Sequence, residues 1–132
     1  MQSYWVLADK DTAVVSKKIQ QLTEGVNAGS FILVKVIGCV NKEKSVCVHV
    51  CVVDEECTCV AVTIYNMGKE PKIGDALLIP NPVFRHIHVS DGHLEIQYPS
   101  LRVDNPLHLL LNGYSLTSAF LAKPRVENAA RP

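Results

Sequence analysis

Val46–Val53 reads VCVHVCVV and residues 57–65 read CTCVAVTIY, with only three acidic residues between the two runs. Branched apolar side chains occupy every second position in both runs. Because successive side chains of a strand point to opposite faces of a sheet, this period of two is typical of strands that are buried on one face. The short acidic turn joins them, so the sequence predicts a β-hairpin.

The two faces of this hairpin differ in chemistry. One face holds the branched apolar residues Val46, Val48, Val50, Val52, Val60, Val62 and Ile64. The other holds Cys47, His49, Cys51, Cys59, Ala61, Thr63 and Tyr65. Burial of an apolar side chain contributes about 1.5–3 kcal/mol, and a slip of one residue would exchange the faces. We therefore expect Val48, Val50, Val62 and Ile64 inside the fold and His49 outside.

A long apolar run, Ser30–Val40, precedes the hairpin and exceeds the usual strand of about five or six residues. Gly38 near its end permits a bulge or a sharp bend. One bent strand can then belong to two sheets, which is how small barrels avoid exposed edges.

Further strand patterns follow the hairpin. Asp91-Gly92 separates two alternating runs and predicts a second hairpin. The predicted strands are Ala76–Ile79, Val83–Val89, Leu94–Tyr98, Leu101–Asp104 and Leu107–Leu111. This order predicts an all-β fold, a small five-stranded OB-fold barrel with an extra N-terminal segment. A plain β-sandwich has the same periodicity and stays open as the alternative.

The ends of the chain are less patterned, and we divide the sequence into three parts. Residues 1–28 form an N-terminal extension with one possible short strand at Ser3–Ala8, and Ile19 and Leu22 anchor the extension to the core. Residues 19–27 are either a last helical turn or an extended loop. Residues 29–115 form the OB-fold domain. Residues 116–132 form a C-terminal tail that we expect to be largely flexible.

Composition narrows the classes of function. The 132 residues suffice for one domain, and 13 basic residues balance 13 acidic ones. A neutral chain is a poor candidate for a dedicated nucleic-acid binder, which usually carries a basic excess. No apolar run approaches the roughly 18 residues of a membrane span. The start does not resemble a secretory signal, and five cysteines are an odd number, so we expect free thiols in the nucleus and cytoplasm.

Short motifs spread over residues 25–113 resemble one family. They are Gly25-Val26-Asn27, Val52-Val53-Asp54, Ala61-Val62, Tyr65-Asn66, Ile73-Gly74-Asp75, Ile79-Pro80, Pro82, Arg85-His86, Arg102-Val103, Pro106 and Asn112-Gly113. In this order and spacing they resemble the carboxy-terminal OB-fold domain of the Strap family of tetratricopeptide-repeat proteins.

The resemblance implies a stress-responsive transcription coactivator. Such proteins are scaffolds that bring a histone acetyltransferase to a transcription factor, and their OB domain is linked to chromatin. It implies protein partners, namely a helical-repeat domain and transcription cofactors. This chain departs from the family because no tetratricopeptide repeats are visible in it, so functions of the repeats do not carry over.

Two groups of residues are candidates for binding. OB folds bind peptides or single strands on the outer face of the central hairpin, where Cys51, Ala61 and Tyr65 lie. Basic residues that could form a rim are Lys42, Lys44, Arg85 and His86. Only Tyr65 could stack on a base, so we predict a protein-interaction module and keep weak binding of single-stranded or chromatin DNA as the alternative.

Metal and catalytic sites are not expected. Cys51, Cys57 and Cys59 could approach one another near His49, but the tight knuckle of zinc ribbons is missing. Cys47 and His49 could form a dyad, yet nothing in the sequence predicts a cleft or a third orienting group. No phosphate loop or nucleophile elbow occurs. We therefore expect no enzyme, no cofactor and no small-molecule substrate.

Overall fold

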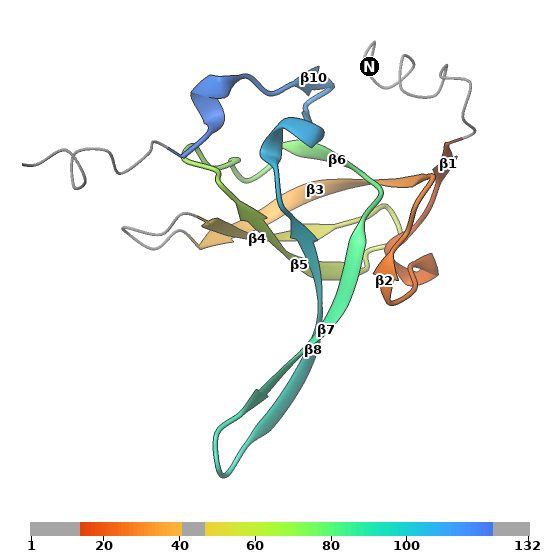
Figure 1. The fold of residues 1–132 in the computed structure, drawn as a ribbon. Coiled ribbons are helices and arrows are strands. Elements are labelled where there is room, and N and C mark those ends of the chain that lie inside the picture. The colour runs from red at the N-terminus through yellow and green to blue at the C-terminus, as the bar shows by residue number, and fades with distance from the viewer. Residues whose placement is uncertain (1–13, 41–46, 123–132) are drawn as a thin grey trace, which may run out of the picture.

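The computed structural model describes residues 14–40 and 47–122, and strands dominate this part of the chain (Figure 1). The strands are β1 (Val15–Ser16), β2 (Gly25–Val26), β3 (Ser30–Val40), β4 (Cys47–Val53), β5 (Cys59–Tyr65), β6 (Ala76–Pro80), β7 (Val83–Ser90), β8 (Glu95–Val103), β9 (Leu110–Leu111) and β10 (Tyr114–Ser115). Helical structure in this part is limited to the 3₁₀ turns η1 (Ile19–Gln21), η2 (Pro106–His108) and η3 (Ser118–Phe120). No helix there is long and apolar enough to cross a membrane.

The strands form one strongly curved sheet in the order β10-β9-β6-β3-β4-β5-β8-β7-β2. Strand β3 pairs antiparallel with β6 along its first half and with β4 along its second half. The register slips between Val36 and Gly38, which is the irregularity expected at that glycine. Strand β5 pairs parallel with β8, and β8 pairs antiparallel with β7. The predicted all-β OB fold is confirmed.

The barrel is not closed by hydrogen bonds. Strands β6 and β7 stand near the two ends of the sheet order, and among the described strands no ladder joins them; the chain itself passes from one to the other through Asn81 and Pro82. Asn81 has a left-handed φ of 46°, and Pro82 has no N–H to donate. The corner is held by Asn27, whose side-chain amide donates to the Pro82 carbonyl at 3.0 Å.

The hairpin of β4 and β5 has the predicted faces. Val48 pairs with Ile64 and Val50 with Val62, and all four side chains are buried in the core. His49 is exposed on the opposite face. Ile19 and Leu22 are buried in the same core, so these anchors of the N-terminal segment are confirmed.

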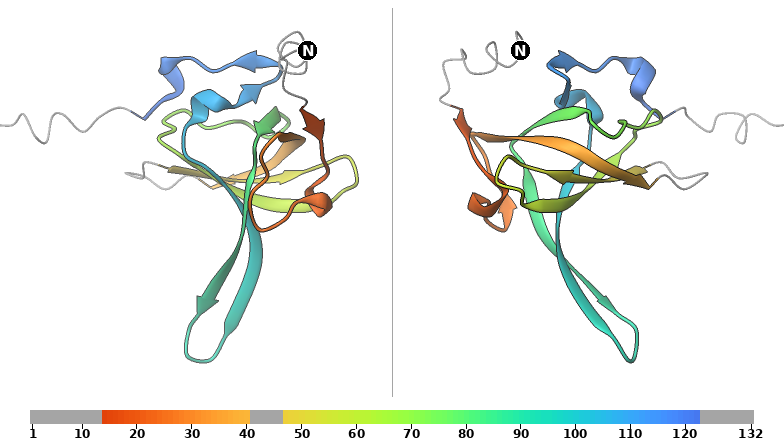
Figure 2. Two further views of the ribbon diagram at one scale, coloured as in Figure 1. Left: turned by 45° about the vertical axis from the view of Figure 1, so that its right-hand side comes forward. Right: turned by 180° about the vertical axis from the view of Figure 1, so that it is seen from behind.

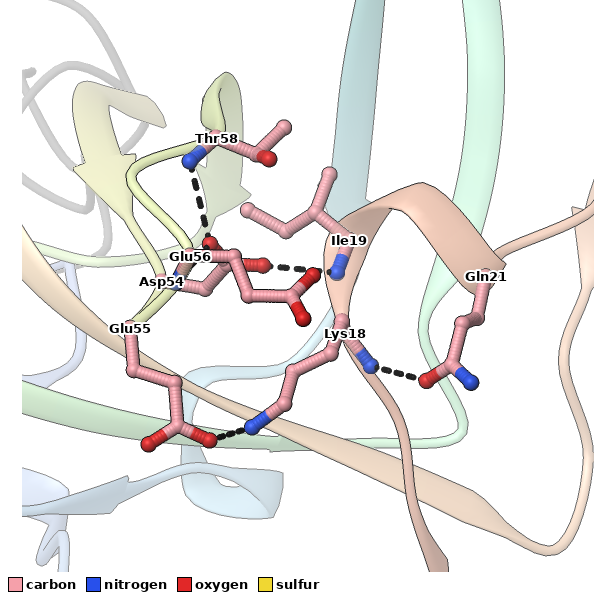
Figure 3. Close-up of polar contacts among 7 residues, drawn as sticks. All are labelled: Lys18, Ile19, Gln21, Asp54, Glu55, Glu56 and Thr58. Atoms are coloured by element: carbon pink, nitrogen blue, oxygen red, sulfur yellow. Dashed lines mark hydrogen bonds and ion pairs between the residues drawn. The ribbon is translucent and has the colours of Figure 1, made fainter.

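The N-terminal segment is joined to the turn between β4 and β5 through Asp54. This carboxylate is buried, and it accepts hydrogen bonds from the backbone N–H of Ile19 at 2.9 Å and of Glu56 and Thr58 at 3.0 Å each (Figure 3). On the surface beside it, Lys18 forms an ion pair with Glu55. The segment that these contacts hold is a single 3₁₀ turn, Ile19–Gln21, and the backbone is extended at Leu22.

Four predicted strands differ from the structure, because Leu94–Tyr98 and Leu101–Asp104 are joined in the single strand β8. Strand β5 begins at Cys59 and not at Cys57, because Cys57 has a left-handed φ of 64° that ends the turn. Strand β8 continues through Pro99, which stands opposite His86 of β7 beyond the last β5 partner, so its missing N–H breaks no ladder with β5. The expected strand Leu107–Leu111 is divided. Leu107 and His108 belong to the turn η2, because Pro106 begins a 3₁₀ turn capped by the Asn105 side chain, and Leu110–Leu111 form the strand β9.

Some predicted features lie outside the described residues. They are the possible strand Ser3–Ala8, the loop that carries Lys42 and Lys44, and residues 123–132 of the expected tail. Residues 116–122 are described: Leu116 is buried, and Leu121 forms a bridge to Met67. The three domain boundaries stay predictions.

Candidate interaction face

The outward side chains of β5, β8 and β7 form a continuous surface, which we call the outer face. In the register, Ala61 and Arg85 both pair with Ser100, and Thr63 pairs with Arg102. Paired residues of neighbouring strands share a face. The outward positions are Cys59, Ala61, Thr63 and Tyr65 on β5, Ile96, Tyr98, Ser100 and Arg102 on β8, and Val83, Arg85, Ile87 and Val89 on β7.

A small hollow lies where β5, β8 and β7 meet. Its volume is about 100 Å³, and it is lined by Thr63, Tyr65, Arg85, Ile87, Ser100, Leu101 and Arg102. The Arg102 guanidinium lies 4.7 Å from the centroid of the Tyr65 ring, a cation–π distance. Arg102 Nε also donates to Asp104 Oδ1 at 2.6 Å, and this hydrogen bond together with the carboxylate charge raises the pKa of Arg102.

Arg85 differs from Arg102 in its partners. Its side chain is exposed at the edge of the hollow, and within residues 14–40 and 47–122 it has no hydrogen bond or ion pair. An unpaired guanidinium retains all its donors for a ligand oxygen. The hollow therefore contains one arginine that is already neutralised and one that is available.

The hairpin of β7 and β8 extends well beyond the body of the fold, as the long turquoise ribbon in Figure 2 shows. We call residues 85–99 the arm. Along its outer face the cross-strand pairs are Ile87 with Tyr98 and Val89 with Ile96. Leu94 at the tip is 58% exposed, and Val89, Ile96 and Tyr98 are 46%, 45% and 39% exposed. An exposed apolar ladder on a two-stranded ribbon is a feature of interaction surfaces.

The opposite face of the arm is polar. His86, His88 and Ser90 alternate there with Gln97 and Glu95 of β8. His86 Nδ1 lies 3.0 Å from the Glu24 carboxylate of the N-terminal segment. Arg85 and His86 are neighbours in sequence but lie on opposite faces, so only Arg85 belongs to the hollow.

The thiols and the imidazole of the central hairpin lie on the outer face of β4 and β5. His49 Nδ1 lies 3.0 Å from Thr63 Oγ1, and its Nε2 lies 3.6 Å from Cys47 Sγ. Cys51 is exposed and Ala61 is half-buried beside it in the register. In the described part of the chain, no group of three or more His, Cys, Asp or Glu side chains is placed to hold a metal ion.

The hairpin pattern predicts Cys51, Ala61 and Tyr65 on this side of the sheet, and it predicts Arg85 only as part of a separate basic rim. Two components of the surface are not predicted from the sequence. In the sequence Arg102 stands out only as part of a family motif, although it covers the ring of Tyr65. The apolar ladder of the arm has the alternation of an ordinary strand, which does not predict an exposed surface. The signal that could have found it is the Asp-Gly turn, which aligns Val89 with Ile96 across the hairpin.

The strand order, the parallel β5–β8 pair and the bent β3 define an OB fold. The chain is similar to the OB domain of a Methanosarcina mazei protein solved by solution NMR, with a TM-score of 0.52 over 79% of this chain and 85% of that chain. The two are 15% identical, so this likeness concerns the fold alone.

The family follows from the sequence comparisons. Residues 13–125 match the family described as tetratricopeptide repeat protein 5 OB fold domain, and the chain belongs to that family. It is 34% identical over 118 residues to tetratricopeptide repeat protein 5 of mouse, cattle and human. The match covers 88% of this chain and 26% of each relative, so the chain spans about a quarter of their length. The family resemblance inferred from the motifs is confirmed.

Proposed function

We propose that the chain is a non-enzymatic protein-interaction module, the OB-fold part of a Strap-like coactivator scaffold that acts in the nucleus and cytoplasm. The observation that carries the proposal is the exposed apolar ladder of the arm, continuous with the outer face of the sheet. Its partner is another protein domain, in the first place the helical repeats after which the matching relatives are named.

The form of the outer face supports docking of a protein over enclosure of a small molecule. This face is an open sheet, and its hollow of about 100 Å³ is small beside the roughly 300–1,000 Å³ of pockets that enclose small molecules, a range that two other hollows of about 520 Å³ each do reach. Docking of a helix or a strand needs only such an open apolar surface.

We expect Ile96→Lys to abolish docking of a repeat domain. The partner would be the repeat region of human tetratricopeptide repeat protein 5, titrated into this chain by isothermal calorimetry. A lysine in the middle of the ladder leaves a charge at the centre of the interface, so affinity should fall at least tenfold. Ala61→Lys on the sheet should weaken binding as well.

Ile73→Lys is the matched control, because Ile73 is also an exposed isoleucine but lies in the loop between β5 and β6. It should bind like the unmodified chain. Equal losses in Ile96→Lys and Ile73→Lys, or no loss in either, would contradict the assignment of this surface.

Weak DNA binding is the second candidate, favoured by two arginines beside an aromatic ring on an OB face. Against it, Arg102 already covers the ring of Tyr65 and shares its charge with Asp104. If DNA binds here, two phosphate contacts should lower the affinity about tenfold between about 50 and 200 mM salt. Titration of labelled single- and double-stranded DNA at both salt concentrations is the measurement, and no binding at low salt removes this candidate.

A further inference from the structure

We infer that the hollow and the arm bind an extended acidic peptide, in which one carboxylate pairs with Arg85 and alternate apolar side chains lie along the ladder. This inference rests on the proposed protein-interaction function and adds a second kind of protein ligand for the same surface, an extended segment beside the helical-repeat domain. It follows from the charge, the spacing and the free edge of β7.

The charged side chains at the outward positions of β7 and β8 are all basic. From the hollow to the tip, the outward positions of β7 and β8 hold two arginines, hydroxyl groups and apolar side chains, and no carboxylate. Glu95 stands opposite Ser90 and therefore belongs to the other face, while Asp104 is bound to Arg102. The unpaired guanidinium of Arg85 suits a carboxylate, which accepts two parallel hydrogen bonds from it.

The size of the hollow fits the end of one acidic side chain. About 100 Å³ is room for the end of one short side chain, such as a carboxylate with its last methylene. The ring of Tyr65 is covered by Arg102, so a nucleobase has no free ring here on which to stack.

The spacing of the ladder matches a strand. Arg85, Ile87 and Val89 are alternate residues of β7, so their side chains repeat about every 7 Å. Strand β2 pairs with β7 only at Val83 and Phe84, and within the described chain no strand covers the same edge of β7 farther along the arm. Beside Arg85 and His86 this edge faces Glu24, whose carboxylate lies 3.0 Å from His86 Nδ1, so the free edge begins at Ile87. A peptide added there would place alternate side chains opposite Ile87 and Val89, with its acidic residue next to Arg85.

The ligand is therefore a peptide that contains an acidic residue and carries apolar residues two and four positions away from it. A nucleic acid would offer phosphates along its whole length, and the apolar ladder would leave most of them without partners. A peptide satisfies both halves of the surface at once.

A labelled ten-residue peptide tests the inference, with glutamate near its centre and leucine at alternate positions on both sides. Fluorescence anisotropy would be measured with the full chain and with Arg85→Glu, alongside a second peptide in which lysine replaces the glutamate. The unmodified chain should prefer the glutamate peptide at least tenfold. Arg85→Glu should reverse the preference, because the swapped pair restores opposite charges.

Two further variants separate charge from contact. Lys72→Glu reverses an exposed basic residue in the loop before β6 and should leave the preference unchanged. Val89→Lys should weaken both peptides, since it interrupts the ladder. Thermal unfolding of each variant checks that the fold is intact.

Equal binding of both peptides by the unmodified chain would overturn the inference, and so would a glutamate preference that survives Arg85→Glu. Displacement of the peptide by single-stranded DNA, with no effect of Val89→Lys, would assign the surface to nucleic acid instead. If the peptide fails to bind while the repeat domain still binds in an Ile96-dependent manner, only this inference fails. If neither binds, the proposed function fails with it.

Discussion

Val62→Asp is expected to unfold the domain completely. Val62 is fully buried, and in the register it stands opposite Val50 in the centre of the core. An ionised carboxylate without a partner is not tolerated there, and its desolvation costs several kcal/mol. The valine contacts are lost as well. A domain of this size has only about 5–15 kcal/mol of total stability, so this single change removes most or all of it.

His49→Asp is the control on the opposite face of the same hairpin. His49 is exposed, and the change removes its contact with Thr63 Oγ1, a hydrogen bond worth about 1 kcal/mol. Circular dichroism should show a cooperative thermal transition for His49→Asp and none for Val62→Asp. Comparable damage in the two variants would mean that the inner and outer faces are reversed, and the interaction face would then be wrong.

The faces of β4 and β5 were predictable because both edges of each strand are paired and one face is fully buried. In such a strand every second side chain must be apolar, because a polar side chain on the buried face would lose its contact with water. Val48, Val50, Val62 and Ile64 all lie where the pattern placed them. The bend of β3 was predictable for a related reason, because an eleven-residue strand exceeds the usual length and Gly38 marks the irregularity.

The arm was not predictable from the same rule. Strands β7 and β8 also alternate, but the alternation does not say where the core ends. Phe84 and Leu101 pair inside the fold, whereas the same face two residues farther along carries His86 and is already in solvent. The apolar residues of the arm lie on the other face, away from the core. The buried face and the apolar face of β8 differ in the arm because β8 pairs with β5 only from Ser100 onward, and the residues before Ser100 have no core to cover.

The motifs that revealed the family are mostly structural. Asn27 holds the corner between β6 and β7, and Asp75 and Asn112 bind each other at 3.1 Å beside the start of β6. Asp75 also accepts from the backbone N–H of Lys72. Each of these hydrogen bonds needs one particular residue type at one position, which is why the motifs identify the fold well. They carry little information about the ligand, so the candidate site had to be found from the geometry.

Asp54→Asn should cost about 3 kcal/mol of stability, the second-largest effect expected in this chain. Asp54 is 6% exposed and accepts three backbone hydrogen bonds, two within the β4–β5 turn and one from Ile19 that joins the N-terminal segment to this turn (Figure 3). Asparagine can still accept from Glu56 and Thr58 through its one carbonyl oxygen. Its NH₂ group then faces the N–H of Ile19, and two donors meet in a buried place where each lost bond to a charged acceptor is worth about 1.5–3 kcal/mol.

The measurement is thermal unfolding together with amide hydrogen exchange. The melting temperature should fall by more than about 10 °C, and the amide of Ile19 should exchange much faster. Glu55→Gln is the matched control, since it is the same chemical change at the neighbouring residue, where an exposed ion pair with Lys18 contributes only about 0–1 kcal/mol. If Glu55→Gln destabilises as strongly as Asp54→Asn, surface charge rather than the buried carboxylate holds the segment. Fast exchange confined to the segment, with the core amides of β4 and β5 still protected, would show that Asp54 acts by holding Ile19 over the core.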